Sequence, residues 1–268
     1  MGGLLDGKVV LVNGGTQGAA VARTAAREGA IVTVTGRRAE PGEALVAELT
    51  AAGARATYAR ADLADAEQAG ASVTRVVAAH GRVDCLVNAA GLTSRGTLLD
   101  TTPELFDAHL AVNLRGPFFA MRAAVADMVA RGAPGTIVNI GSNCAHGGPP
   151  HLAAYSAAKA GLAGLTRNAA HAHRWDRIRI NTLNIGWTAT EGEDATQRSF
   201  HGAGENWREE AGRRLPMGRL GDPAEIAEFV VLLLSDRSGV VTGSVLDWDQ
   251  QVTGSVLDWD QQVPGGQD

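Results

Sequence analysis

Several features that mark large classes of protein are scarce or missing in this sequence. Only two cysteines, Cys85 and Cys144, occur among 268 residues, and their spacing fits neither a disulfide framework nor a metal site. Two isolated cysteines favour a reducing compartment. No histidine cluster or paired-carboxylate spacing is present, so we expect no bound metal.

Clustered positive charge and long apolar runs are also missing. The formal net charge is -5 at pH 7, which argues against a nucleic-acid partner. The longest apolar runs, such as residues 229–234, are too short to span a bilayer. The first residues have neither a basic start nor a long apolar run, so no secretory signal is visible. We therefore expect a cytoplasmic protein without a membrane partner.

Short β-branched runs instead alternate with long alanine-rich stretches. The pattern predicts strands at residues 9–12, 31–35, 57–59, 83–87, 136–140 and 179–183. It predicts helices at residues 17–28, 43–52, 66–80, 104–131, 153–173 and 223–234. This alternation indicates an α/β fold in which helices cover both faces of a parallel sheet. The strands are nearly continuous apolar runs, as burial on both faces requires.

The end of the sequence contains an internal repeat. Residues 242–252 recur without change at 253–263, which is too little to build a repeat architecture. A recent in-frame duplication or a sequence error is the simpler interpretation, and a functional tail or subunit contact is the alternative. A last strand at 244–246 needs only one copy, and the first copy gives the shorter connection. We predict one catalytic domain at 1–252 and a duplicated tail at 253–268.

A glycine-rich loop follows the first predicted strand and opens a helix. Gly14 and Gly18 permit a tight turn and a close backbone approach, and the helix start offers free N–H groups to a pyrophosphate. The second strand ends without the carboxylate that would bind a ribose 2′-hydroxyl. Arg37 and Arg38 stand there instead and can bind a 2′-phosphate. The pattern favours NADP(H) over NAD(H).

Tyr155 and Lys159 lie four residues apart in a predicted helix, so their side chains share one face. An ammonium about 4 Å from a phenolate is worth roughly 4 kcal/mol at an effective dielectric constant of about 20. That energy can lower a tyrosine pKa by up to about 3 units. We therefore expect Tyr155 to act as an acid or base near neutral pH.

Taken together, the motifs resemble those of the short-chain dehydrogenase/reductase family over residues 6 to about 250. The resemblance implies a single-domain, Rossmann-type doubly wound parallel sheet. It implies catalytic roles for Ser142, Tyr155, Lys159 and Asn113. It implies cofactor contacts along the loops that follow the strands, at Asn13, Gly14, Thr16, Gln17, Gly18, Ala19, Arg37, Arg38, Asp62, Leu63, Asn88, Ala89, Ala90, Gly91, Tyr155, Lys159, Gly186, Trp187, Thr188 and Thr190.

The resemblance also implies how the four catalytic residues act. Ser142 would bond the substrate oxygen, Tyr155 would exchange a proton with it, and Lys159 would hold the nicotinamide ribose and lower the tyrosine pKa. Asn113 would hold a water that connects Lys159 to solvent. A homo-oligomer, tetramer or dimer, built partly from the helices at 104–131 and 153–173 is also implied.

Four residues depart from the family pattern, and none of them removes a reacting group. Ala20 stands for a glycine, Asn13 for a threonine, Ala89 for an asparagine and Ile185 for a proline. The last change would leave the segment along the nicotinamide less rigid.

The resemblance places the substrate among loops 92–98, 143–151 and 187–214. We expect Ser142, Asn143, His146, Tyr155 and Trp187 to contact a small-molecule substrate. The last loop is long and polar, and its Phe200 and Trp207 could close over the substrate as a lid. The polar rim favours a polyol or sugar-like substrate.

Three functions fit these residues. The leading one is an NADP(H)-dependent carbonyl reductase or alcohol dehydrogenase. A 3-oxoacyl-thioester reductase shares every catalytic residue but should present a basic patch to an acidic carrier protein. A catalytically idle NADP-sensing or scaffold protein is the third, and the intact Ser142, Tyr155 and Lys159 weigh against it.

Overall fold

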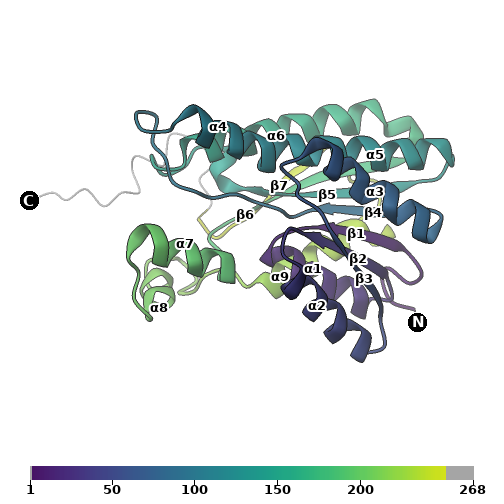
Figure 1. The fold of residues 1–268 in the computed structure, drawn as a ribbon, viewed down its shortest axis with the longest axis horizontal. Coiled ribbons are helices and arrows are strands. Elements are labelled where there is room, and N and C mark those ends of the chain that lie inside the picture. Colours follow the sequence, from purple (N-terminus) through teal and green to yellow (C-terminus); the bar gives the residue numbers. More distant parts are fainter. Residues whose placement is uncertain (1, 252–268) are drawn as a thin grey trace, which may run out of the picture.

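A seven-stranded, all-parallel sheet forms the centre of the molecule (Figure 1). The computed structural model describes residues 2–251. The strand order is β3-β2-β1-β4-β5-β6-β7, so the chain winds outward from the middle in both directions. The strands are Val9–Asn13 (β1), Ile31–Gly36 (β2), Arg55–Arg60 (β3), Cys85–Asn88 (β4), Gly135–Ser142 (β5), Ile178–Ile185 (β6) and Val245–Trp248 (β7). The predicted Rossmann-type fold is confirmed.

Helices cover both faces of this sheet (Figure 1). One face carries α1 (Thr16–Arg27), α2 (Ala39–Ala51) and α9 (Pro223–Leu234), and the other carries α3 (Ala66–His80), α5 (Gly116–Ala130) and α6 (Ala153–Ala172). Alternate residues of β1 enter opposite cores, because Val10 and Val12 pack with the first set and Val9 and Leu11 with the second. This two-sided burial explains the nearly continuous apolar runs.

A row of polar side chains crosses the sheet near the carboxyl ends of five strands. Strand pairing aligns Thr35, Asn13, Asn88, Asn139 and Thr182, and all five are buried. Hydrogen bonds join neighbours along this polar row, including Thr35 Oγ1 to Asn13 Oδ1 at 2.8 Å and Asn88 Nδ2 to Asn139 Oδ1 at 2.8 Å. Thr166 of α6 links the Asn139 amide to the Thr182 hydroxyl. Each buried amide therefore has a partner, as low-dielectric surroundings require.

Several segments differ in extent or type from the sequence-based prediction, and β3 and β5 are each three residues longer than expected. The helical segment expected at 104–131 is formed by α4 (Pro103–Leu110), a π-helical turn, η1 (Ala111–Arg115), and α5, which follow one another without a gap. The loop expected at 187–214 contains α7 (Glu191–His201) and α8 (Trp207–Gly212), which we call the lid. The sixth strand is three residues longer than expected and ends at Ile185.

The last strand of the sheet uses the first copy of the repeat, as predicted. β7 pairs with β6, and Trp248 aligns with Ile185. The second copy, 253–263, lies outside the described residues, so the proposed division at 252/253 stays a prediction.

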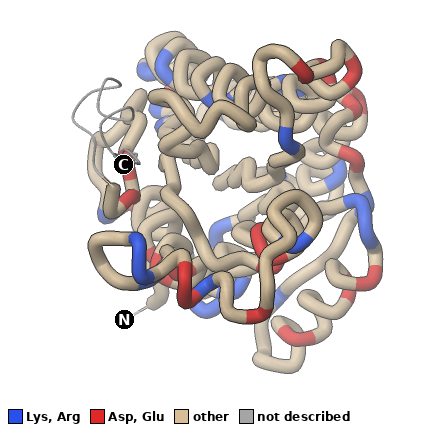
Figure 2. Tube along the Cα trace, turned by 90° about the vertical axis from the view of Figure 1, so that its left-hand side faces the viewer, with Lys and Arg blue, Asp and Glu red and all other residues tan. Residues whose placement is uncertain are grey.

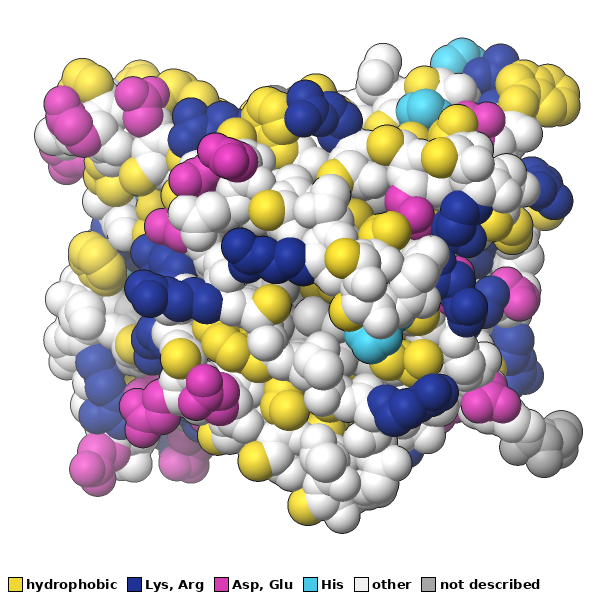
Figure 3. Space-filling model, turned by 45° about the vertical axis from the view of Figure 1, so that its right-hand side comes forward, with side chains coloured by type: hydrophobic (Ala, Val, Ile, Leu, Met, Phe, Trp, Pro, Cys, Tyr) yellow, Lys and Arg dark blue, Asp and Glu magenta, His cyan; other side chains and the backbone are white. Residues whose placement is uncertain are grey.

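The described surface carries charges of both signs. Figure 3 shows basic and acidic side chains interspersed over one face, with small apolar side chains between them. Among residues 2–251, no helix is long and apolar enough to cross a bilayer.

Candidate active site

The predicted catalytic residues come from adjacent elements at the carboxyl ends of the strands. Ser142 ends β5, Tyr155 and Lys159 lie in the first two turns of α6, and Asn113 lies in η1. In open parallel sheets, ligands bind beyond these ends, where the strand order reverses. The four residues are therefore placed where the fold offers a ligand site.

Lys159 is buried behind the Tyr155 ring. Its Nζ donates a 2.7 Å hydrogen bond to the Ile140 carbonyl oxygen and lies 5.7 Å from the centre of the phenol ring. The ammonium is 3% exposed, and its desolvation lowers the pKa of Lys159 to about 8. The Lys159 ammonium therefore lies near the phenol ring, while its hydrogen bond is accepted by the Ile140 carbonyl of β5.

The pKa of Tyr155 shifts in the direction opposite to the sequence-based expectation. Burial raises it above its usual range, the Cys144 thiol acts in the same direction, and hydrogen bonding with Ser142 opposes both. The expected depression assumed an ammonium about 4 Å from the phenol oxygen, whereas the Lys159 ammonium bonds Ile140. Tyr155 is therefore a protonated phenol at neutral pH, so the proton that reduction requires is present.

A hydrogen-bonded chain leads from Ser142 to the last strand. The Ser142 hydroxyl donates to Asn143 Oδ1 at 3.4 Å, and Asn143 Nδ2 donates to Asp249 Oδ2 at 2.6 Å. Gly186 makes room for this carboxylate, since a Cβ there would clash with it. The Ser142 backbone N–H is held separately by Asn184.

His146 faces an acid rather than an open pocket. Its Nε2 lies 2.9 Å from Asp247 Oδ1, which also accepts a hydrogen bond from the Asn184 amide. Sequence reasoning missed Asp247 and Asp249 because the motifs of the last strand were judged only as a repeat. Their alternate positions, Asp247 in β7 and Asp249 just beyond its end, could have indicated that both side chains lie on one face of this segment.

Asn113 fixes the loop that follows β4. Its side chain accepts from the Leu92 backbone N–H at 3.1 Å and donates to the Leu92 carbonyl at 3.0 Å. Asn113 lies within the π-helical turn η1, and its side chain is fully buried. Such turns inside helices are frequent at functional sites.

The loop after β1 has the features of a phosphate cradle. Gly14 and Gly15 adopt φ values of 70° and 80°, and a Cβ at Gly15 would clash with the Ala89 carbonyl. No side chain caps the start of α1, so its first N–H groups are free to bind an anion. Within residues 2–251, the buried Gln17 Oε1 has no hydrogen-bond partner. These residues fit a dinucleotide.

The other predicted cofactor residues lie along the same edge of the sheet. The Tyr58 hydroxyl donates to the Gly36 and Arg38 carbonyls, which fixes the turn where Arg37 and Arg38 are exposed. Asp62 accepts from the Ala64 backbone N–H, and Leu63 is buried. The β4 loop contributes Asn88, Ala89, Ala90 and Gly91.

The segment after β6 connects to the lid. Trp187 Nε1 donates to Glu193 Oε1 at 2.8 Å, and its ring lies 6.1 Å from that of Trp207. Thr190 caps α7 by accepting from the Glu193 N–H. The spacing Thr190-x-x-Glu193 is a capping-box signature, and it could have predicted this helix. Thr188 bonds back to the Gly186 carbonyl.

No group of three or more potential metal ligands occurs within the described part of the chain.

The fold and the geometry of the site define a nicotinamide-dependent oxidoreductase site. Comparison with known proteins agrees, because residues 15–253 match a family profile described as "Enoyl-(Acyl carrier protein) reductase". The chain belongs to the short-chain dehydrogenase/reductase family, and it is an oxidoreductase acting on CH–OH or C=O groups.

Individual relatives are similar over nearly their whole length. The L-rhamnose 1-dehydrogenase (NAD(P)(+)) of Sphingomonas sp. is 35% identical, covering 91% of this chain and 95% of the relative. The 3-oxoacyl-[acyl-carrier-protein] reductase of Thermotoga maritima is 34% identical, covering 91% and 97%. Among solved structures, an actinorhodin polyketide ketoreductase variant with NADPH has a TM-score of 0.86 at 31% identity, covering 93% and 98%.

Proposed function

We propose that this chain is an NADP(H)-dependent oxidoreductase that interconverts a secondary alcohol and a ketone or aldehyde. The observation that carries the proposal is the position of Tyr155. Hydrogen bonding with the Ser142 hydroxyl acts on its pKa, and the buried Lys159 ammonium lies 5.7 Å from the centre of its ring. The nicotinamide cofactor supplies or accepts the hydride when bound. The residues of the chain orient the substrate oxygen and move one proton.

In the reducing direction, Ser142 donates a hydrogen bond to the carbonyl oxygen. Tyr155 then transfers its phenolic proton to that oxygen as the carbonyl carbon is reduced, which leaves an alcohol and a phenolate. We propose that the Lys159 ammonium, 5.7 Å from the centre of the phenol ring, offsets only part of the cost that burial imposes on the phenolate. Tyr155 regains its proton from solvent, and Asn113 is the proposed anchor of the relay water. Oxidation runs through the same steps in reverse.

Replacing the tyrosine tests this mechanism. Tyr155→Phe keeps the ring and removes the proton, so we expect turnover to fall by about 10²- to 10⁴-fold. NADPH binding, followed by cofactor fluorescence, should change little. Unchanged turnover would refute the role of Tyr155. An intact wild-type protein that binds NADPH and turns over nothing in a broad carbonyl panel would instead favour the idle NADP-sensing or scaffold protein.

The preference for NADP(H) rests on the end of β2. Arg37 and Arg38 are exposed there, and neither forms an ion pair with a carboxylate of the described residues. We expect Arg37→Asp to weaken NADPH binding much more than NADH binding. Arg55→Asp makes the same charge change at the opposite end of β3 and serves as the control. Equal losses for both cofactors would exclude Arg37 as the 2′-phosphate ligand.

For the substrate, we propose a small polar compound of polyol or sugar type. The polar loops around the site and the name of the Sphingomonas relative support it. A 3-oxoacyl thioester is the second candidate, supported by the Thermotoga relative and the matching profile. Figure 2 views the lid end and shows acidic and basic residues interspersed there, which favours the first candidate over an acidic carrier protein. Turnover confined to acyl thioesters would reject the polyol class.

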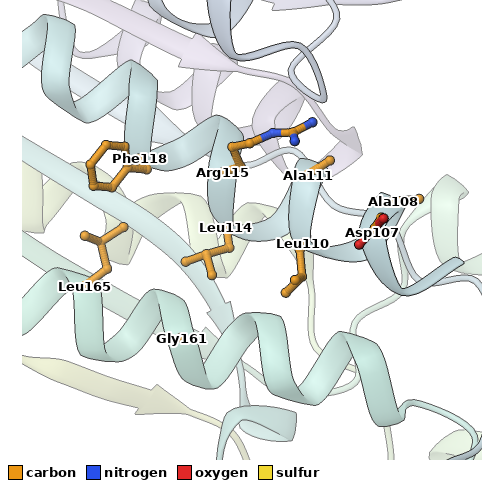
Figure 4. A pocket seen from close by; sticks show the side chains of 9 residues that line it. All are labelled: Asp107, Ala108, Leu110, Ala111, Leu114, Arg115, Phe118, Gly161 and Leu165. Carbon is orange, nitrogen blue, oxygen red and sulfur yellow. The ribbon is translucent and has the colours of Figure 1, made fainter. Parts of the chain in front are cut away.

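We also propose a homo-oligomer and a cytoplasmic location. A pocket lined by Leu110, Leu114, Phe118 and Leu165 opens between α4, η1 and α5 on one side and α6 on the other (Figure 4). Phe118 is 44% exposed, so a second copy that covers this surface would remove apolar area from water.

The proposed cytoplasmic location rests on the two cysteines. The free, buried thiols of Cys85 and Cys144 support a reducing compartment.

A further inference from the structure

Three side chains able to carry positive charge meet on the substrate side of the site. Arg95 follows β4, His151 precedes α6, and His201 ends α7, so each comes from a different one of the loops around the substrate. Arg95 Nε donates to His201 Nε2 at 3.1 Å, and the rings of His151 and His201 lie 5.3 Å apart. We call these three residues the basic cluster.

The backbone fixes the basic cluster next to Tyr155. The Gly96 N–H donates to the His151 carbonyl at 2.9 Å, and the Ala153 N–H donates to the Gly96 carbonyl at 3.3 Å. Arg95 is therefore next in sequence to Gly96, whose backbone pairs with His151 and Ala153. Ala153 lies two residues before Tyr155. The charge of Arg95 reaches the reacting group, because Arg95 acts to lower the pKa of Tyr155 against the larger effect of burial.

Arg95 of the basic cluster has no ion-pair partner among the described residues. Its other contact is a hydrogen bond from Nη1 to the Thr93 carbonyl. Burial and the charges of Arg95 and His201 all lower the pKa of His151. An anion bound here would pair with the Arg95 charge and favour protonation of the two imidazoles.

Two acids of the adjacent lid helix α7, Glu193 and Asp194, have other partners. Glu193 accepts from Trp187 and Gln197, and its charge acts to raise the pKa of Tyr155. Asp194 is paired with Arg198 and Arg208. A bound anion would therefore meet Arg95 and the two imidazoles, while Glu193 is a carboxylate whose charge acts on Tyr155.

We propose that the substrate carries an anionic group, a carboxylate, sulfonate or phosphate, that binds the basic cluster while its carbonyl or alcohol carbon lies at Tyr155. The guanidinium can donate two parallel hydrogen bonds to such a group, and the imidazoles can add donors. Because His201 belongs to α7, the anion also links the lid to the β4 loop. This inference rests on the proposed function and narrows its substrate class to polar compounds with a charged end.

Matched substrates test the inference. We would measure reduction of 3-oxobutanoate, 4-oxopentanoate and 5-oxohexanoate against their methyl esters, with wild type and Arg95→Gln. We expect wild type to prefer at least one acid over its ester by about 10- to 100-fold in kcat/KM, as charge-assisted hydrogen bonds of this kind allow. In Arg95→Gln, the acid-to-ester ratio should fall towards one, and Arg95→Lys should keep part of it. Arg237→Gln, an equal charge change in the 3₁₀ turn η4 (Asp236–Ser238) after α9, should keep the full ratio.

The outcomes separate this inference from the proposed function. Equal use of acid and ester by wild type, or a ratio unaffected by Arg95→Gln, would overturn the inference and leave the function intact. If wild type reduced no ketone, the proposed function would fail. Calorimetric titration of the NADPH-loaded protein with glutarate would then decide the inference alone. Binding to wild type at least tenfold tighter than to Arg95→Gln would support it, and equal or absent binding would overturn it. Should Arg95→Gln fail to fold, the wild-type and Arg95→Lys ratios decide.

Discussion

The buried ammonium of Lys159 should make the stability of the protein rise with alkaline pH, and Lys159→Met should remove that rise. Desolvation lowers the pKa of Lys159 to about 8 in the folded chain, against 10.5 for the free side chain. Between these two pKa values, the unfolded chain binds more protons than the folded chain. The free energy of unfolding therefore increases with pH across this window.

The size of the effect follows from the same two values. A shift from 10.5 to about 8, at about 1.4 kcal/mol per pKa unit, corresponds to about 3 kcal/mol over the whole window. About 2 kcal/mol of this should appear between pH 7 and pH 9.5. The assay is urea unfolding of wild type and Lys159→Met at both pH values. Methionine has similar length and no titrating group, so the thiol and phenol contributions largely cancel in the difference.

Lys8→Met is the matched control, because Lys8 is the only other lysine and its side chain is 36% exposed. If the difference in unfolding free energy between wild type and Lys8→Met rose by a similar amount from pH 7 to pH 9.5, the effect would come from the loss of any lysine. A difference between wild type and Lys159→Met that stays flat, or falls, from pH 7 to pH 9.5 would refute the desolvation argument.

Three other predictions follow from the site and the apolar pocket. Because burial raises the pKa of Tyr155, alcohol oxidation, which needs the phenolate, should rise about tenfold per pH unit from pH 7 to 9 in initial rates, while reduction stays flat; a plateau beginning below pH 8 would contradict this. Asp249→Leu should free the Asn143 amide and lower kcat about tenfold with KM for NADPH unchanged, whereas Asp249→Asn should restore most activity; equal loss in both variants would remove the positioning role. Phe118→Asp should shift the protein to smaller species in analytical ultracentrifugation, and an unchanged sedimentation coefficient would exclude this surface as an interface.

Local patterns in the sequence were sufficient for the fold and for the elements that carry the predicted catalytic residues. The β-branched runs of β1 and β2 are uninterrupted because both faces are buried, and the glycine loop follows directly. The π-helical turn at Asn113 could not be predicted, since residues 104–115 contain no glycine or proline that marks a change of helix type. The Asn113 amide in this turn pairs with the Leu92 backbone, a contact that the local pattern does not show.

The direction of the Tyr155 pKa shift escaped sequence reasoning for a similar reason. Spacing along α6 places Lys159 on the same helix face as Tyr155, but only the fold shows that the Ile140 carbonyl of β5 accepts a hydrogen bond from its ammonium. The partners of Asn143 and of Arg95 likewise come from segments far away in sequence, at Asp249 and His201. Contacts of that separation leave no periodic trace in the chain.

The amides that cross the sheet constrain how the strands can assemble. If β1 or β4 slipped by one residue, Asn13 or Asn88 would turn towards the opposite apolar core and lose its partner, at a cost of about 1–3 kcal/mol for each stranded amide. We expect misaligned sheets to be rejected during folding for this reason. The loops after β1 and β4, which would hold the reactants, start one residue beyond Asn13 and Asn88. The same strand alignment therefore also sets the distance between the two reactants.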